Sequence, residues 1–324
     1  MKKSWISILL AVVLVSMFAV GCFAAEEYKF TGPVTLFITH QVGGTVDGTS
    51  RGIAPFLAQE LGVNVIPQNR EGAGGRTIRA EVFNRTRPDG YTILATGMPS
   101  LQLGELLFEG NYKTDQFTFI GNVTGTDSGV LLVAADSPIN SLEDLRNLGE
   151  ANCFLGSGGG FGSSDQLLST MVREIANIQH RMIPYDGDAE MITAVLGHQI
   201  TAGLTSFSTL RRFREQVKVL AIFDDERAPD IDAPTFLELG YEGMVSGSDI
   251  GIVAPPGLPE HIRKTLSDAL ARANANPEFH EWAARTGWDL NPLNSEEHRE
   301  HALSIYSQMQ VFAPIMLEEI AANQ

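Results

Sequence analysis

The stretch VTLFITHQVGGTVDGTSRGIAPFLAQEL, residues 34–61, carries the pattern that decides the fold. It opens with an apolar run of strand length, Val34–Thr39. A glycine-rich loop follows, and apolar residues then recur at helical spacing, at Ile53, Phe56, Leu57 and Leu61. The stretch therefore predicts a strand, a loop and a helix in that order, which is half of a β-α-β unit.

The same alternation continues along the chain. Further strands are predicted at 63–66, 91–96, 117–123, 130–134, 153–155, 181–184, 201–205, 217–223 and 250–254. Helices are predicted after Ser141 and at 164–175, 189–196, 209–215, 259–273, 277–286 and 295–320, the last broken near Pro314. The alternation predicts an α/β fold of mostly parallel sheets with helices on both faces. Because ligands of such sheets bind beyond the carboxyl ends of the strands, the strand-to-helix loops are the place to look for a site.

Length and charge limit the possible functions. The 324 residues predict about two domains, and because no low-complexity linker separates them, we expect the chain to cross between two lobes more than once. The net charge is −16, with 39 acidic and 23 basic residues, so nucleic acid is not an expected partner. A small anionic ligand is still compatible, because backbone N–H groups in a cleft can bind it whatever the overall charge.

The N-terminus has the pattern of a secretory signal peptide over residues 1–25: two lysines, an apolar run, then small residues. The run is slightly short for a transmembrane anchor, which needs about 20 residues. Ala19-Val20-Gly21-Cys22 resembles a bacterial lipobox, which would leave a lipidated Cys22. Cleavage after Ala24 or Ala25 would leave a free protein. Both forms stay open, and we expect an exported chain in either case.

The loop after the first predicted strand, residues 40–51, has the composition of an anion site. Gly43 and Gly44 allow a close approach of the backbone to a ligand, and Thr45 begins a run that supplies hydroxyl groups. The following helix N-terminus adds partial positive charge. These features suit a carboxylate. For Asp47 itself, a first-turn acid that caps the helix is the favoured interpretation, with ligand contact as the alternative.

A second loop of glycine and serine, Gly156–Asp165, also leads from a strand into a helix. It lacks the lysine of a P-loop, and no register of the dinucleotide-binding glycine pattern fits it. Ser163 and Ser164 can act as helix caps or as ligand donors. Two weaker loops, 185–188 and 205–208, occupy the same topological position. A nucleotide or other cofactor is therefore not expected.

Catalytic or metal-binding interpretations have little support. The chain has no G-x-S-x-G nucleophile motif. His298 and His301 have the spacing to share a metal, but the acidic residues around them suggest a solvated helix face, and no third ligand is evident. Cys153 lies in an apolar stretch and is interpreted as a buried small hydrophobe.

With these loops identified, the chain resembles a known family, the periplasmic solute receptors of tripartite tricarboxylate transporters, also called Bug or TctC-like proteins. The likeness covers about residues 28–320. The matching segments are short, but they occur in the family's order and spacing. They are Gly43-Gly44 with Asp47 and Arg51, residues 69–75, 87–92, 160–163, 184–187, 196–199, 233–236 and 254–257.

The resemblance implies a type II periplasmic binding protein fold, with the ligand in a cleft between two lobes that close by hinge motion. It implies lobe 1 at 26–125 plus 226–324 and lobe 2 at 126–225. It also implies a monomeric, non-enzymatic receptor that captures a small organic carboxylate and passes it to membrane subunits. Loop composition and resemblance together give these candidate ligand-binding residues: His40, Gln41, Gly44, Thr45, Asp47, Gly162, Ser163, Ser164, Tyr185, Ser206 and Phe207.

Two departures from the family pattern bear on the ligand. His40 stands where the family usually has an apolar residue such as Phe, so we expect it to contact the ligand beyond the shared carboxylate. Asp186 and Asp188 would suit a ligand that carries an amine, although we expect both to be solvent-facing caps. Two other functions stay open: an exported α/β hydrolase that uses Ser163 or His40, and a receptor that feeds a signalling system.

Overall fold

The computed structural model describes residues 28–322, except 41, 44, 71, 73, 74, 109, 126, 186, 287, 289 and 291. The expected signal peptide, with Cys22, lies outside the described residues, as do Gln41, Gly44 and Asp186. Among the helices that are described, none is both long and apolar enough to cross a membrane.

Lobe 1 is built on a five-stranded sheet: β1 (Val34–Ile38), β2 (Val65–Asn69), β3 (Thr92–Met98), β4 (Thr118–Asn122) and β10 (Gly247–Ala254). The strand order is β2-β1-β3-β10-β4, and β10 runs antiparallel to both of its neighbours in this sheet. The helices of this lobe are α2 (Thr45–Leu61), α3 (Arg76–Arg85), α4 (Ser100–Phe108), α9 (Glu260–Asn274), α10 (Pro277–Thr286) and α11 (Ser295–Ala322).

Lobe 2 repeats this plan. Its strands are β5 (Asp127–Ala134), β6 (Phe154–Ser157), β7 (Arg181–Pro184), β8 (Ala202–Ser206) and β9 (Val217–Phe223), in the order β7-β6-β8-β5-β9. Here β5 is the antiparallel strand. The helices are α5 (Leu142–Leu148), α6 (Ser164–Glu174), α7 (Asp188–Leu196) and α8 (Phe207–Phe213). The predicted two-lobe α/β fold with mostly parallel sheets is confirmed.

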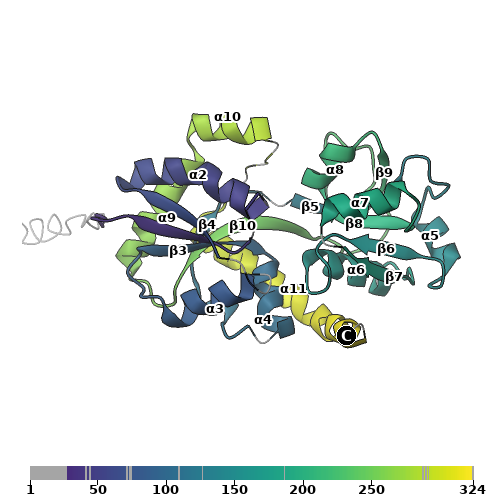
Figure 1. Ribbon diagram of the computed structural model, residues 1–324, viewed down its shortest axis with the longest axis horizontal. Helices are drawn as coiled ribbons and strands as arrows, with labels where there is room; N and C mark the ends of the chain where they lie inside the picture. The colour runs from purple at the N-terminus through teal and green to yellow at the C-terminus, as the bar shows by residue number, and fades with distance from the viewer. Residues whose placement is uncertain are drawn as a thin grey trace, which may run out of the picture.

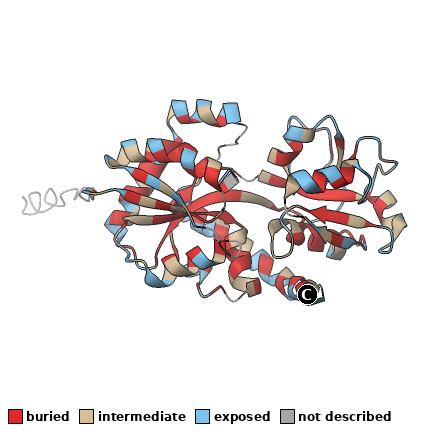
Figure 2. Cartoon of the chain, in the orientation of Figure 1, coloured by how far each residue is buried: buried red, intermediate tan, exposed pale blue. Residues whose placement is uncertain are grey.

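Both faces of each sheet are buried, because successive residues of one strand enter different apolar clusters. In β1, Leu36 packs in the cluster that contains α2 and α9, while Phe37 packs against the cluster that contains α3. In β5, the neighbouring residues Leu131 and Leu132 likewise belong to two different apolar clusters, one on each face of the sheet. Figure 2 shows the buried residues running through the middle of each lobe.

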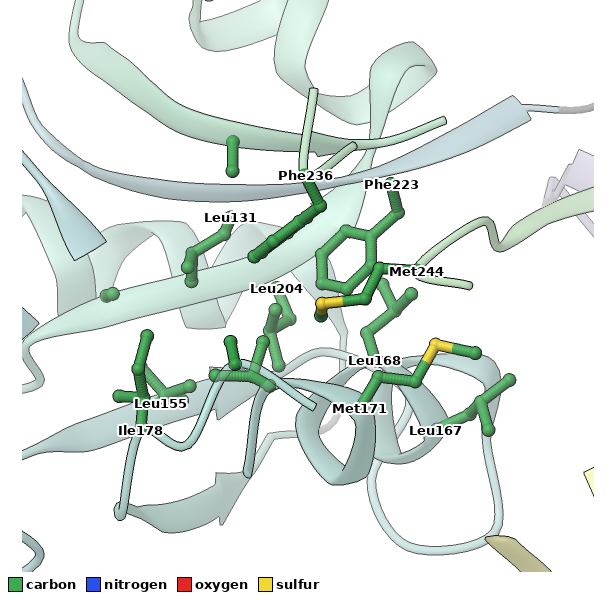
Figure 3. Packing of buried hydrophobic residues seen from close by; sticks show 14 of the residues in the cluster. Leu131, Leu155, Leu167, Leu168, Met171, Ile178, Leu204, Phe223, Phe236 and Met244 are labelled. Carbon is green, nitrogen blue, oxygen red and sulfur yellow. The ribbon is translucent and has the colours of Figure 1, made fainter. Parts of the chain in front are cut away.

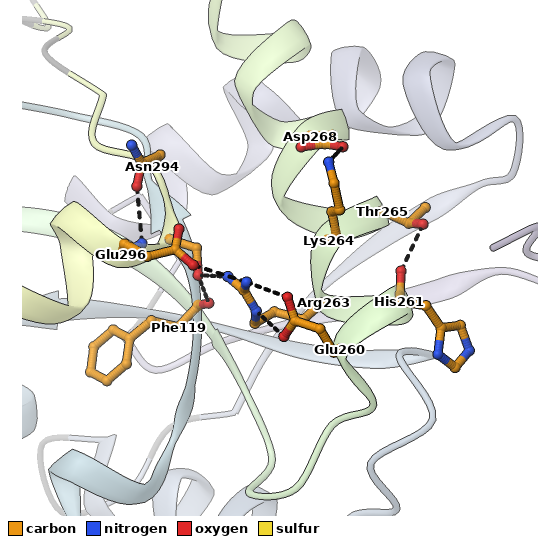
Figure 4. Close-up of polar contacts among 10 residues, drawn as sticks. Phe119, Glu260, His261, Arg263, Lys264, Thr265, Asp268, Asn294 and Glu296 are labelled. Atoms are coloured by element: carbon orange, nitrogen blue, oxygen red, sulfur yellow. Dashed lines mark hydrogen bonds and ion pairs between the residues drawn. The ribbon is translucent and has the colours of Figure 1, made fainter. Parts of the chain in front are cut away.

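Strands β5 and β10 join the two lobes (Figure 1). They pair only at their starts, Ser128 with Gly247 and Asp127 with Ser248. The end of α11 makes a third link, because Gln166 of α6 donates to the carbonyl of Met316 (3.2 Å) and Arg173 forms an ion pair with Glu319. The start of α11 is fixed on lobe 1, where Arg263 of α9 binds Glu260 and Glu296 and the Ser295 hydroxyl donates to the Phe119 carbonyl (Figure 4).

The segment between β9 and β10 packs on lobe 2. Phe236 and Met244 belong to the cluster of Phe223 and Leu168, and the Phe223 and Phe236 ring centroids lie 4.5 Å apart (Figure 3). The predicted boundary at 225/226 would place this segment in lobe 1. Ala233, Phe236 and Met244 nevertheless pack in the apolar clusters of lobe 2. The domain boundaries themselves stay a prediction.

Two details differ from the prediction. Helices α3 and α4 were not predicted. Helix α11 is continuous through Pro314 and not broken there. A proline removes one N–H donor and disfavours a helix interior, but Met309, Ala313 and Met316 are buried on either side of it and hold the helix in place. The predicted cap is confirmed: the Ser141 side chain accepts from the Asp144 N–H at the start of α5.

Cys153 is fully buried, as predicted, and burial raises the pKa of its thiol to about 11. Only the thiolate reacts with alkylating agents. We therefore expect iodoacetamide at about pH 8 to leave Cys153 unmodified in the folded protein and to modify it after denaturation. Mass spectrometry of the peptide that contains Cys153 measures this, and labelling of the folded chain as fast as a free thiol would contradict it.

Candidate functional site

A cleft of about 320 Å³ lies between the two lobes, where β5 and β10 cross from one to the other. Lobe 1 lines it with residues from the loop after β1, from α2, β3 and β10, and from the start of α4. Lobe 2 lines it with residues from the start of β5 and from the segments that lead from β6, β7 and β8 into the following helices. The lining residues are His40, Val46, Gly97, Met98, Ser100, Asp127, Gly158, Gly159, Ser164, Asp165, Gly187, Asp188, Thr205, Ser206, Ser208, Thr209, Ser248, Asp249 and Ile250.

A larger hollow, of about 580 Å³, lies along α3 and the end of α4 and contains Arg76, Asn84 and Phe108. Its lining residues all belong to one lobe, whereas the cleft lies at the carboxyl ends of strands from both lobes. Ligands of open α/β sheets bind at those ends, so we place the candidate site in the cleft between the lobes.

His40 is fixed in the lobe 1 wall directly after β1. Its Nδ1 lies 2.8 Å from the Thr39 hydroxyl, and Asn69 Nδ2 donates to the His40 carbonyl (2.9 Å). Burial, with a smaller contribution from the charge of Arg79, lowers the pKa of His40 to about 4. The ring is therefore neutral near pH 7 and offers a ligand hydrogen bonding without charge.

Asp47 lies behind this wall and does not line the cleft. Its carboxylate accepts from the Gly43 N–H (2.9 Å), from Asn69 Nδ2 (2.8 Å) and from Arg51 Nε (2.8 Å). Burial opposes ionisation, but these hydrogen bonds outweigh it and hold the pKa of Asp47 below its usual value. Through Asn69, Asp47 fixes the loop that carries His40, which is the capping role weighed from the sequence.

In lobe 2, Ser163 and Ser164 have different roles. The Ser163 hydroxyl donates to the Gly160 carbonyl (2.7 Å) and accepts from the Gln166 N–H, so this residue caps α6. Ser164 lines the cleft. Gly162 has a φ of 81°, and a Cβ there would lie 2.4 Å from the ring of Phe108 in lobe 1, so this glycine lets the two lobes approach each other closely.

Three carboxylates of lobe 2 reach the cleft. Asp127 at the start of β5 accepts from the Ser208 N–H (3.0 Å), and Asp165 accepts from the Gly159 N–H (2.9 Å). Asp188, the first residue of α7, lines the cleft and accepts from the Thr209 hydroxyl (2.7 Å). Burial is the main cause that raises the pKa of Asp127 and of Asp165, the latter to about 7 with a contribution from the charge of Asp188.

The floor of the cleft contains a fourth carboxylate, Asp249 of β10. Its Oδ2 lies 2.7 Å from Nε2 of His301, a contact that raises the pKa of His301. His298 is fully buried against Phe119, with ring centroids 5.1 Å apart. The prediction that the two histidines lie on a solvated face was therefore wrong. Gly251 of β10 leaves the space that the His298 ring fills.

The structure thus brings His40, Ser164 and Ser206 together in one cleft. Asp47, Gly162 and Ser163 support the cleft from behind, Tyr185 packs against the apolar cluster of lobe 2, and Phe207 is buried in that cluster. Gln41 and Gly44 lie outside the described residues, and of Thr45 only its position as the first residue of α2 is described. Asp165, Thr205 and Ser208 lie in loops that the sequence analysis selected, but they were not named as ligand contacts. Sequence reasoning missed the lining residues Ser100, Asp127, Thr209, Ser248 and Asp249.

Comparison with known proteins decides the family. The model of the tripartite tricarboxylate transporter family receptors matches residues 49–311. The chain belongs to this family. It is 32% identical over 286 residues to the UPF0065 protein in the gbd 5' region of Cupriavidus necator, which covers 86% of both chains.

Solved structures agree with this membership. The receptor's fold is similar to that of the periplasmic binding protein BugD, with a TM-score of 0.69 and 27% identity, covering 90% of this chain and 98% of BugD. It is also similar to Rpa4515 of R. palustris, solved with adipate, with a TM-score of 0.73 and 22% identity, covering 88% and 97% of the two chains. The latter likeness concerns the fold.

We expect His40→Phe to weaken binding of the receptor's ligand by about threefold to tenfold, the usual value of one hydrogen bond. His40→Gln, which keeps hydrogen-bonding groups, should weaken it less. Since the His40 ring is neutral well above a pKa of about 4, the affinity ratio of wild type to His40→Gln should stay constant from about pH 6 to about pH 8. Calorimetry measures both effects, with His280→Phe on exposed helix α10 as the control. An unchanged ligand profile in His40→Phe would remove this residue from the site.

Proposed function

We propose that this chain is an extracytoplasmic receptor that captures a small organic carboxylate in the cleft between its lobes and delivers it to the membrane subunits of a tripartite tricarboxylate transporter. The observation that carries the proposal is the cleft itself, lined by both lobes in a chain of this receptor family. Export by a signal peptide at residues 1–25, a periplasmic location and a monomeric state belong to the same proposal. Lipid attachment at Cys22 is an alternative form of the N-terminus.

Closure of the lobes supports capture. β5 and β10 cross between the lobes and pair with each other only at Asp127–Ser248 and Ser128–Gly247. Because only these two residue pairs connect the strands, their hydrogen bonds can adjust when the two rigid lobes rotate, as in hinged binding proteins. Closure about these strands would bring His40 and Ser100 toward Ser164 and Ser206 and exclude water from the ligand.

The lobe 1 wall supports an acid group on the ligand. Ser100 lies at the N-terminus of the nine-residue helix α4, whose first turn has no acidic residue. The unsatisfied N–H groups of such a terminus favour an anion. The buried guanidinium of Arg79 lies behind it and donates to the Ser100 carbonyl (3.0 Å). Its positive charge contributes to the lowered pKa of His40. A carboxylate is therefore favoured at this wall.

A hydrolytic function has less support. The Ser163 hydroxyl, the nucleophile weighed from the sequence, is engaged with Gly160 and Gln166 as a helix cap. A nucleophile needs a hydrogen-bonded base, whereas the Ser163 hydroxyl bonds to a backbone carbonyl and a backbone N–H. We therefore propose binding without turnover.

The test is a thermal-shift screen of small organic acids that includes adipate, malate, succinate, glutarate and citrate, followed by calorimetry. A ligand at about 100 times its Kd should add about 2.7 kcal/mol of stability and raise the Tm. Gly162→Phe, placed against Phe108, should block closure and reduce the affinity at unchanged secondary structure. Absence of binding across the acids, or conversion of a bound acid to product, would contradict the proposal.

A further inference from the structure

We propose that the ligand carries a protonated amine in addition to its acid group, and that the lobe 2 wall of the cleft, through Asp127, Asp165 and Asp188, receives the amine. The inference rests on the proposed function, binding of a small organic acid in this cleft, and specifies the class of that acid as amphoteric.

The first observation is the sign of the charge on the two walls. The three lobe 2 carboxylates come from three different elements: the start of β5, the first turn of α6 and the first residue of α7. The described residues that line the cleft include neither lysine nor arginine. The charge of Arg211 acts to lower the pKa of Asp127. Arg211 itself does not line the cleft and forms an ion pair with Asp230 (3.5 Å). A purely anionic ligand would therefore face repulsion from lobe 2.

The carboxylates also occupy backbone donors that could otherwise bind an anion. Asp165 accepts from the Gly159 N–H in the glycine loop, and Asp127 accepts from the Ser208 N–H at the start of α8. Asp188 begins α7, where its charge offsets the partial positive charge of that helix N-terminus. These two backbone donors of the wall are thus already matched with protein carboxylates. The wall presents acceptor oxygens, which suit a ligand that donates hydrogen bonds.

The second, independent observation is a buried polar atom without a partner. Thr205 at the end of β8 lines the cleft and is 2% exposed, yet its hydroxyl has no hydrogen-bond partner among the described residues. Oδ1 of Asp249, also 2% exposed and part of the lining, lacks a described partner as well. Buried polar atoms of folded proteins are nearly always paired, so each of these two atoms leaves a hydrogen bond for a ligand in the cleft to supply.

An ammonium group fits these atoms better than a metal ion. Among the described residues, no set of three or more His, Cys, Asp or Glu side chains is arranged to hold a metal. An ammonium group has three donors and no acceptor, so it can bind two carboxylates and a hydroxyl at once. It would also relieve the repulsion between Asp165 and Asp188, which contributes, after burial, to the raised pKa of Asp165.

The experiment compares acids with their 2-amino derivatives by calorimetry on the full receptor: succinate with aspartate, glutarate with glutamate, and adipate with 2-aminoadipate. We expect the amino form of the best-binding pair to bind at least about tenfold more tightly. Asp188→Asn keeps the shape and an acceptor for the Thr209 hydroxyl, and should bring the two affinities of that pair within about threefold of each other. Asp127→Asn provides a second variant if Asp188→Asn is poorly folded. Asp268→Asn on α9, which removes the same charge outside the cleft, should leave the preference unchanged.

Each alternative result is distinguishable. Equal or tighter binding of the acids without the amine, with affinity that rises in Asp188→Asn, would overturn this inference and leave the proposed function intact. Binding of those acids that requires added Mg²⁺ and is abolished by EDTA would assign the carboxylates to a metal complex and also overturn it. Absence of binding by both series would contradict the proposed function together with this inference.

Discussion

Replacement of Gly251 by alanine should destabilise the receptor by about 1–3 kcal/mol, as expected for overpacking of a rigid core. A Cβ at this position would lie 2.2 Å from Cε1 and 2.3 Å from Nε2 of His298. The backbone cannot move aside, because Gly251 lies in β10 between Thr96 of β3 and Asn122 of β4. The His298 ring is fully buried and packed against Phe119, so it has no free space either.

Thermal unfolding of four variants tests this account: Gly251→Ala, His298→Ala, the double variant and the control Gly97→Ala. The control is a glycine of neighbouring strand β3 at which a Cβ would meet other atoms only at 3.8 Å or more. We expect the double variant to lose less stability than the two single variants lose together, because His298→Ala removes the ring with which the new methyl group clashes. Additive effects, or an equal loss in Gly97→Ala, would contradict the proposed packing.

Replacement of Asp47 by alanine should have the second large effect, a loss of about 1–3 kcal/mol of stability together with weaker ligand binding. The change leaves the Gly43 N–H and Asn69 Nδ2 without their buried acceptor and removes the partner of Arg51. Since Asn69 also holds the His40 carbonyl, we expect the first loop of the cleft to lose its fixed position and the affinity to fall by about tenfold.

The effect of Asp47→Ala should depend on pH with a definite sign. The pKa of Asp47 is lowered in the folded protein, so its ionisation stabilises the fold above the ordinary value of 3.8, and this contribution is lost as the pH falls through the lower folded value. The difference in unfolding free energy between wild type and Asp47→Ala should therefore be larger at about pH 7 than at about pH 3. Asp268→Ala, at a surface ion pair with Lys264 on α9, is the matched control. A difference that does not change with pH would exclude the ionic role of Asp47.

The strand-to-helix loops of the site could be predicted from the sequence because parallel strands bring their carboxyl ends to one edge. This reasoning placed His40 after β1, Ser164 at the start of α6 and Ser206 after β8, and all three line the cleft. It missed Asp127 and Asp249 for a topological reason. They lie at or near the starts of β5 and β10, and these strands run antiparallel, so their starts lie where the neighbouring strands end. The alternation of strands and helices along the sequence gives no sign that these two strands run in the opposite direction.

Helix α3 escaped prediction for a local reason. The described inward-facing residues of α3 are Ile78, Arg79 and Val82, and a buried arginine breaks the apolar pattern by which such a helix is recognised.

The burial of His298 depends instead on a distant residue, because the space for its ring comes from Gly251, 47 positions away in the sequence (298 − 251). A polar helix segment next to several glutamates gives no sign of such a space.

The most direct measurement is a crystal structure of the receptor with the tightest-binding acid from the screen. We predict one molecule of ligand in the cleft, in contact with His40 or Ser100 of lobe 1 and with Asp188 or Ser206 of lobe 2, and with the lobes closer together than in the structure described above. A ligand that contacts a single lobe, or that lies in the hollow along α3, would contradict the account.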